Sequence, residues 1–340
     1  MVSIAFFNNK GGVGKTTLLC NFASFVQQKL HKKVLVVDAD PQCNTTSYVL
    51  DDDVCDALYN KKNDQFTIYK IMEPLQDGLG YVDKEKVKPI LSESFGFMLI
   101  PGNPRLSSTE DFLARDWSQT LAGETRGVRS TLVFSHFLSL CNDYDFVFFD
   151  MGPSLGAINR SILLACEYFI TPMSADIFSL LALENIGESV SKWREDFNNG
   201  IVKVEKSALD RLPEIKKRCD IKFIGFVEQQ YIKKTENGAY RPVQAYEDIL
   251  QQIPSKIIEH IVNPINKEPL MAIDYKIGSI PNYHSLVPMS QSAHKPIFNL
   301  SGPDGIVGAH YRRVKDYEEL MKEITEKAFG NLEIIKNGRK

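Results

Sequence analysis

The sequence predicts an α/β protein whose mostly parallel, twisted sheet is covered by helices on both faces. Short apolar runs rich in β-branched and aromatic residues alternate with helical segments along the 340 residues, which is the pattern of a parallel sheet with crossover helices. The runs at 34–37 and 146–149 are continuously apolar, as in strands buried on both faces. The glycine-rich segment 9–17 separates the first apolar run from the first helical run, which is the order of a phosphate-binding loop.

The apolar runs give the predicted strands. They are Val2–Asn8, Lys33–Asp38, Phe97–Ile100, Phe146–Asp150, Tyr168–Pro172, Ile221–Gln229 and Lys276–Ile280. Segments of helical periodicity lie between and after them. They are Lys15–Leu30, Ser107–Asp116, Thr131–Cys141, Leu155–Cys166, Ala182–Phe197 and Tyr311–Ala328. The alternation breaks at about 51–94 and 198–220 and resumes after each, so we expect one domain over 1–340 with two insertions.

Composition narrows the classes of protein. The chain is 43% hydrophobic and 24% charged, with a formal net charge of −3, so any contact with DNA would need a local basic patch. Its six cysteines show no Cys-x-x-Cys spacing, which argues against zinc and indicates a reducing, cytoplasmic location. No apolar run reaches the roughly 18 residues of a membrane-spanning helix. A strand that starts at Val2 leaves no room for a signal peptide.

The segment from Asn9 to Thr17 reads Asn-Lys-Gly-Gly-Val-Gly-Lys-Thr-Thr. Its glycines allow a tight turn whose backbone N–H groups point at an anion, and the following helix N-terminus favours negative charge. Lys15 is expected to reach the β- and γ-phosphates and the Thr16 hydroxyl to bind magnesium. Asn9 stands where the usual pattern has glycine, so the loop is a variant, and the alternative is a plain glycine-rich turn. The residues expected to line the phosphates are Gly11, Gly12, Val13, Gly14, Lys15 and Thr16.

Two carboxylates follow the second predicted strand, in Asp38-Ala39-Asp40-Pro41-Gln42. Ligands bind beyond the carboxyl ends of strands in open α/β sheets, and strand alternation places Asp38 and Asp40 on one side of the backbone. One is expected to orient a magnesium-bound water and the other to position the attacking water. The alternative is a solvated turn, since Asp and Pro favour turns for local reasons.

A third motif ends the strand at 146–150, where Asp150 follows four apolar residues. This is the Walker B arrangement, in which the carboxylate acts on the magnesium ion. Gly152 comes just after it and would allow a backbone N–H to approach the γ-phosphate. An apolar strand that ends in Asp is common, but as the third motif in this order it favours a P-loop NTPase.

Together these motifs resemble the ParA/MinD family of deviant Walker A ATPases. The family marks are the extra lysine Lys10 in Lys-Gly-Gly-Val-Gly-Lys-Thr-Thr, the Asp-x-Asp-Pro-Gln of 38–42, and a Walker B strand followed by Asp-x-Pro-Pro-Ser-Leu-Gly. Here Gly152 replaces one of those prolines. Segments 97–106, 169–184, 225–227 and 280–297 are also similar to the family, more on its ParA/Soj-like side than on its MinD side.

The resemblance implies an ATPase that uses ATP and Mg2+, forms a homodimer on ATP binding and hydrolyses ATP slowly until a partner stimulates it. Thr17 would contact the α-phosphate, Asp40 would position the hydrolytic water, and Asp150 and Asp38 would serve the metal. Lys10 would reach across the dimer to the partner's phosphates, which makes catalysis depend on assembly. The alternative for Lys10 is a solvated loop lysine.

The adenine site is expected at Gln229, which would hydrogen-bond the base, with Pro281 packed on it. The alternative is that Gln229 is an ordinary exposed residue at a strand end. An iron–sulfur reductase built on the same loop would need a cysteine soon after Asp150. The first one is Cys166, inside the next helical run, so we reject that class.

Two functions remain open. The first is DNA or plasmid partition, or cargo positioning, through non-specific DNA binding and a ParB-like activating partner. Its candidate DNA contacts are Arg312, Arg313 and Lys315, with Lys295, although the acidic residues that follow make a solvated helix face the simpler interpretation. The second is a nucleotide-switched scaffold of a multi-protein system such as phage defence, which the two insertions motivate. The tail 329–340 is interrupted by glycines and asparagine, so we expect no membrane anchor. The protein is expected in the cytoplasm of a bacterial cell, on the nucleoid if it binds DNA.

Overall fold

The computed structural model describes residues 1–60, 66–174, 176–206, 210, 219–231, 234–236, 239–241, 244–266, 273–283 and 285–338. They form an eight-stranded sheet in the order β10-β7-β6-β1-β5-β2-β4-β3. All neighbouring strands pair in parallel except β3 and β4. The predicted fold class, a mostly parallel sheet with helices on both faces, is confirmed.

The strands of this sheet lie close to the predicted ranges, except β3, which was not predicted. They are β1 (Val2–Phe6), β2 (Val34–Ala39), β3 (Ile90–Leu91), β4 (Met98–Ile100), β5 (Phe146–Met151), β6 (Tyr168–Ser174), β7 (Lys222–Tyr231) and β10 (Lys276–Pro281). A separate two-stranded hairpin consists of β8 (Lys234–Glu236) and β9 (Ala239–Arg241).

Helices connect the strands and cover both faces. The longer ones are α1 (Lys15–Gln28), α5 (Thr109–Ala122), α8 (Ala157–Ala165), α9 (Ile177–Val202), α11 (Gln244–Ile257) and α13 (His310–Asn337). The shorter ones are α2 (Asn44–Val49), α3 (Asp52–Tyr59), α4 (Tyr69–Gln76), α6 (Thr125–Thr131), α7 (Val133–Leu140) and α12 (Leu286–Ser292). Single turns and a π-helix complete the chain at η1 (Lys84–Lys86), η2 (Pro104–Ser108), η4 (Ile258–Asn266), η5 (Ile297–Asn299) and η6 (Gly302–Asp304).

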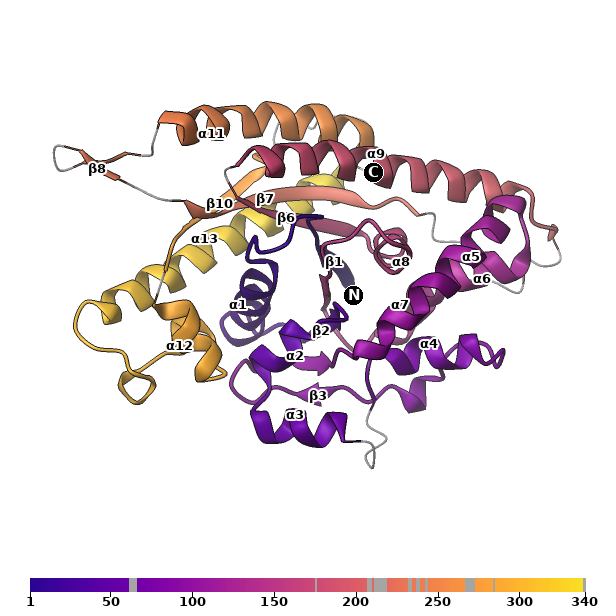
Figure 1. The fold of residues 1–340 in the computed structure, drawn as a ribbon, viewed down its shortest axis with the longest axis horizontal. Helices are drawn as coiled ribbons and strands as arrows, with labels where there is room; N and C mark the ends of the chain where they lie inside the picture. Colours follow the sequence, from indigo (N-terminus) through magenta and orange to yellow (C-terminus); the bar gives the residue numbers. More distant parts are fainter. Residues whose placement is uncertain are drawn as a thin grey trace.

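The two helix layers separate cleanly. Figure 1 shows α1 to the left of the central strands and α8 to their right. α13 contacts α1, β7 and β10, whereas α5, α7 and α9 contact α8. Each layer therefore buries one face of the sheet, as its continuously apolar strands require.

Strand register brings the carboxyl ends of the central strands together. In the paired ladders Asp150 is opposite Phe6 of β1 and Asp38 of β2. The loop that follows β1 and the acidic ends of β2 and β5 consequently meet at one edge of the sheet, where ligands bind in this fold class.

Aromatic rings fill the space between α1 and the sheet. Phe6, Phe22 and Phe148 meet edge to face, with ring centroids 5.5–5.9 Å apart, a favoured geometry for aromatic pairs. Phe329 of α13 joins them by stacking on Phe146 and meeting the edge of Phe22. The core below the glycine-rich loop thus includes a residue from the last helix.

The last helix is longer than predicted. It continues past Ala328 to Asn337, so Gly330 and Asn331 do not interrupt it. The reason is that Asn331 Nδ2 donates to the carbonyls of Ile224 and Asp274, both at 2.8 Å. Packing against the sheet thus outweighs weak helix propensity, and no helix in the described part of the chain has the length and hydropathy to cross a membrane.

The two predicted insertions also acquire structure. Helix α9 runs to Val202, so it includes the first residues of the 198–220 segment; residues 207–209 and 211–218 lie outside the described part. Residues 51–94 contain α3, α4, η1 and β3, and β3 pairs antiparallel with β4 at the edge of the sheet. The description of both segments as insertions in one domain stays a prediction.

Candidate nucleotide-binding site

The glycine-rich loop has the backbone shape that an anion site requires. Gly12 and Gly14 adopt the left-handed region, with φ of 73° and 76°, which glycine enters without the steric cost other residues pay. Helix α1 starts at Lys15, and its N-cap, Gly14, makes no side-chain capping hydrogen bond. The N–H groups of the first turn are therefore free of a side-chain cap and available to a phosphate.

Asn8 anchors the start of the loop. Its Nδ2 donates to the carbonyl of Pro172 at 2.8 Å, and its Oδ1 accepts from the backbone N–H of Lys10 at 2.9 Å. The side chain is fully buried, and it ties the end of β1 to β6. Asn8 was not predicted as a functional residue, because in the sequence it is only the polar end of an apolar strand.

Lys15 follows the glycine-rich loop, and its side chain turns back toward the start of that loop. Its side chain is buried, and its ammonium donates to the carbonyl of Lys10 at 3.1 Å. Burial lowers the pKa of Lys15, while the nearby carboxylates of Asp150 and Asp40 act to raise it. The Lys15 ammonium is therefore a buried cation beside two carboxylates. It can also bind phosphate, as the lysine of such loops does.

Asp150 is held by two threonine hydroxyls. Its Oδ2 accepts from Thr16 Oγ1 and from Thr45 Oγ1, both at 2.7 Å. Its Oδ1 is buried and has no hydrogen-bond partner among the described residues, and burial raises the pKa of this carboxyl. A buried carboxylate oxygen without a partner, close to a threonine hydroxyl, fits Mg2+, which takes one or two carboxylates and otherwise phosphate and water oxygens.

Asp38 lies apart from this group. Its Oδ2 accepts from the backbone N–H and the hydroxyl of Thr46 at 2.8 and 2.6 Å, and Thr46 Oγ1 in turn accepts from Gly102 N. Burial raises the pKa of Asp38 to about 8, and the charge of Asp150 adds to this. Both described contacts of Asp38 Oδ2 are thus with Thr46 of α2, and the metal role of Asp38 stays a prediction.

Asp40 lines a cavity together with residues of the glycine-rich loop. Its Oδ1 accepts from Gln42 N at 3.0 Å. A Cβ added to Gly152 would lie 3.3 Å from this same oxygen, which is closer than most real contacts. The glycine that departs from the family pattern thus packs directly against the candidate water-positioning carboxylate.

Hydrogen bonds fix the segment after Asp150 from two sides. Asn159 Nδ2 donates to the carbonyls of Gly152 and Ser154 at 2.8 and 2.7 Å. From α5, the Glu110 carboxylate accepts from the backbone N–H groups of Ala157 and Ile158 at the start of α8. A carboxylate at a helix N-terminus is favoured by the helix dipole. Neither Asn159 nor Glu110 was predicted, since their partners lie on another segment or across a turn.

A cavity of about 470 Å³ opens over the loop. Its lining includes the predicted phosphate residues Gly11, Gly12, Val13, Gly14, Lys15, Thr16 and Thr17, together with Asp40. A second cavity of about 280 Å³ shares Gly14 and Thr17 with the first and is lined by Gln229 and Pro281. Gln229 is buried, and its Nε2 contacts the Gly14 carbonyl at 3.5 Å. The structure thus brings the predicted base-binding and phosphate-binding residues into adjoining cavities.

The side chain of Lys10 is held at the start of α9. Its ammonium forms an ion pair with Asp176 Oδ2. Asp176 also caps α9, since its Oδ1 accepts from the N–H groups of Phe178 and Ser179 at 3.0 and 3.1 Å. Both side chains of the pair keep about 30% of their surface exposed.

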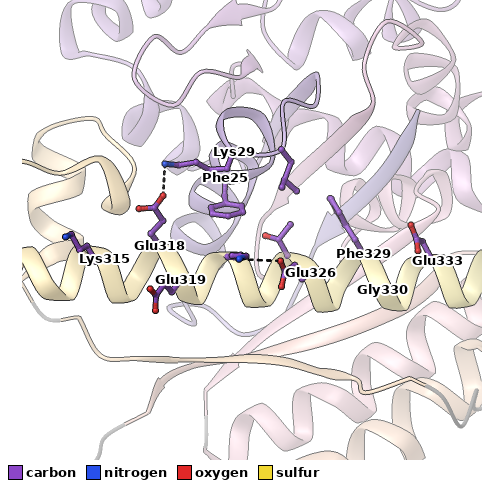
Figure 2. Close-up of a pocket in the computed structure, with 12 residues that line it drawn as sticks. Phe25, Lys29, Lys315, Glu318, Glu319, Glu326, Phe329, Gly330 and Glu333 are labelled. Atoms are coloured by element: carbon purple, nitrogen blue, oxygen red, sulfur yellow. Dashed lines mark ion pairs between the residues drawn. The ribbon is translucent and has the colours of Figure 1, made fainter.

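A larger cavity, of about 800 Å³, lies between α1 and α13. Figure 2 shows Phe25 above the helix that carries Glu318, Glu319 and Phe329, with an ion pair joining Lys29 to Glu318. The candidate DNA contacts lie near here: Arg312, Arg313 and Lys315 are exposed at the start of α13, whereas Lys295 pairs with Asp304 at 2.6 Å.

Comparison with known proteins places this geometry in context. Residues 1–203 match the model of a family described as an AAA domain. A virulence plasmid ParA family protein of Chlamydia psittaci is 29% identical over 191 residues, 56% of this chain and 64% of that protein. The chain therefore matches less than two thirds of that relative.

Two solved structures share the fold. Protein DIP2308 of Corynebacterium diphtheriae has a TM-score of 0.70 and 29% identity, over 86% of this chain and 97% of that one. A putative plasmid partition protein of Borrelia burgdorferi, bound to AMPPNP, has a TM-score of 0.59 and 18% identity, over 96% and 99%. At that identity the second likeness shows the fold alone.

Proposed function

Because the chain belongs to the ParA/MinD family of P-loop ATPases, we propose that it is an ATP-hydrolysing switch that dimerises on binding ATP. We further propose that the ATP-bound dimer binds DNA without sequence preference to partition or position a cargo. The observation that carries the ATPase proposal is the cluster of buried Lys15 and buried Asp150 with Thr16, whose hydroxyl donates to Asp150, at the glycine-rich loop.

The residues divide the chemistry among them. Lys15 and the backbone N–H groups of the loop would hold the phosphates, while Thr16 and Asp150 would hold Mg2+. When bound, the ion supplies charge neutralisation between the phosphates. Asp40, at the rim of the cavity, would accept a hydrogen bond from the attacking water and so align it. Such positioning and charge stabilisation supply most of the catalysis in phosphoryl transfer.

Lys10 would connect catalysis to assembly. In the single chain its ammonium pairs with Asp176, so it contributes nothing to its own nucleotide there. A second copy could offer its phosphates to Lys10, and the turnover rate would then depend on dimer formation. An activating partner, ParB-like in the partition case, would act by favouring this arrangement.

The test is size-exclusion chromatography with light scattering on wild type, Lys10→Ala and Asp40→Ala, with and without ATP, Mg2+ and duplex DNA at low salt. Asp40→Ala is expected to bind ATP and remain a dimer, because the water is no longer aligned. Lys10→Ala is expected to bind ATP and to hydrolyse it at a much lower rate. Normal hydrolysis by Lys10→Ala would exclude a catalytic role in trans.

The same size-exclusion chromatography tests DNA binding. Retention of DNA by the ATP-bound dimer, and its loss at higher salt, would support the partition function. A dimer that leaves DNA free in every condition would overturn the DNA part of the proposal and favour a switch that acts on protein partners.

A further inference from the structure

The first two turns of α9 expose an apolar surface. Ile177, Phe178 and Leu181 are 60%, 68% and 51% exposed. From Glu184 to Asn199 the exposed positions of the same helix are polar, and the next exposed apolar residue is Val202 at its far end. The inner face of the helix is buried throughout its length. The three exposed apolar side chains at the start of α9 therefore form a patch at the end of the helix that Asp176 connects to the glycine-rich loop.

The ion pair with Lys10 fixes the position of this patch. Asp176 immediately precedes Ile177, and its carboxylate holds the Lys10 ammonium. Lys10 is the residue before Gly11, which lines the nucleotide cavity. The patch of Ile177, Phe178 and Leu181 consequently begins one residue after the carboxylate that holds Lys10, next to the loop that lines that cavity.

We propose that this patch is the apolar contact through which two copies of the chain meet when ATP is bound. The proposal rests on the proposed function, in which Lys10 touches the nucleotide of a second copy. The length of its four-carbon stem limits how far the lysine ammonium can lie from the backbone. A copy whose phosphates Lys10 contacts must therefore lie over Asp176 and the first turns of α9.

Symmetry favours a second copy over a different protein. In a two-fold dimer the same patch meets itself, so the surface must be self-complementary. An apolar surface satisfies this requirement, whereas a patch of one charge would repel its copy. Three side chains also fall far short of the roughly 800 Å² that each partner buries in a stable interface. The patch alone would not hold two copies together, which fits an association that needs nucleotide.

The test compares Phe178→Ser/Leu181→Ser with Val202→Ser, a matched control that removes an 85% exposed apolar residue from the other end of α9. All variants carry Asp40→Ala, which slows ATP loss. Light scattering across a protein dilution series with ATP and Mg2+ gives the concentration for half-maximal dimer. We expect at least a tenfold increase for the double variant, no change for Val202→Ser, and unchanged binding of fluorescent ATP by the monomer.

The outcomes separate the two proposals. A parent protein that stays monomeric with ATP would overturn the proposed switch itself. A parent that dimerises together with a double variant that dimerises equally well would overturn the patch alone. A photo-crosslinking amino acid at position 178 gives an independent readout: an ATP-dependent covalent dimer supports the contact. Its absence in a dimeric sample, or crosslinking only to an added activator, overturns it.

Discussion

The ammonium of Lys10 forms an ion pair with the carboxylate of Asp176, 166 positions away in the sequence. One oxygen of this carboxylate accepts the ammonium and the other caps α9. The pair joins the glycine-rich loop to the helix whose first turns carry the apolar patch. Any role of Lys10 outside its own chain requires this contact to break.

Replacing Asp176 by Asn should make dimer formation easier. Asn keeps a carbonyl oxygen that can cap α9, but it removes the charge that competes for Lys10. A partly exposed ion pair contributes up to about 1 kcal/mol, so we expect the ATP concentration for half-maximal dimer to fall by about two- to fivefold. The control is Asp143→Asn, which removes the exposed pair with Lys84. An unchanged or raised ATP requirement for Asp176→Asn would contradict the expectation.

The same pair predicts an acid-dependent loss of stability. Burial acts to raise the pKa of Asp176, but the Lys10 ammonium and hydrogen bonds from Ser179 outweigh it and bring the pKa below its usual value. The stabilisation is therefore complete above the unfolded pKa of about 3.9 and is lost as pH falls through the lower folded pKa. The difference in Tm between wild type and Asp176→Asn should be constant from about pH 7 to 5 and shrink below about pH 4. A difference that vanishes only on the alkaline side would contradict this.

Glu110→Gln should slow hydrolysis more than it weakens ATP binding. Gln has one acceptor oxygen where Glu110 uses two, for Ala157 N and Ile158 N, so the segment from Gly152 to α8 would loosen beside Asp40. We expect a turnover roughly tenfold lower, which corresponds to about 1.4 kcal/mol, with ATP affinity changed less than about twofold. Asp111→Asn, at the next and exposed position, is the control. Equal losses in turnover and affinity would instead indicate a general structural defect.

Asn331→Leu should destabilise the fold. The Asn331 side chain donates to the buried carbonyl of Ile224 and to the partly buried carbonyl of Asp274, and an unsatisfied buried polar group costs about 1–3 kcal/mol. We expect the free energy of unfolding, measured by denaturant titration, to fall by about 1–3 kcal/mol. The exposed residue Asn337 offers the control Asn337→Leu, with a change below about 0.5 kcal/mol. A similar loss for both variants would place the effect in helix propensity instead.

Sequence alone sufficed where a local pattern determines the structure. The glycine-rich loop, the strand before it and the helix after it follow from residues within one short segment, because backbone conformation there depends on glycine. The buried strands could be predicted as well, since short continuous apolar runs such as 146–149 are typical of strands that are covered on both faces. The cavity lined by Gln229 and Pro281 adjoins the cavity over the loop, which agrees with the sequence-based placement.

The parts that sequence did not reveal depend on partners far along the chain. The Thr45 hydroxyl donates to Asp150, which lies 105 positions later in the sequence. Nothing in the residue type or local sequence of either one predicts this hydrogen bond. The hydrogen bonds from Thr46 to Asp38 Oδ2 were likewise not predicted, although the two residues are only eight positions apart. The last helix continues through Gly330 because the Asn331 side chain donates to the carbonyls of Ile224 and Asp274. Both residues are far from Asn331 in the sequence, so the spacing of apolar residues could not predict these contacts.

The contact between Phe329 and Phe22 has a consequence for synthesis. Phe22 belongs to the helix that follows the glycine-rich loop, and Phe329 packs on it from the last helix. A growing chain on the ribosome therefore carries an incomplete apolar core under its nucleotide loop until residue 329 has emerged. Contacts this far apart in sequence also carry a large loop-closure entropy cost, which slows folding. Nucleotide would then find its finished pocket only on chains translated almost to the end, so that fragments from interrupted synthesis would be poor competitors for it.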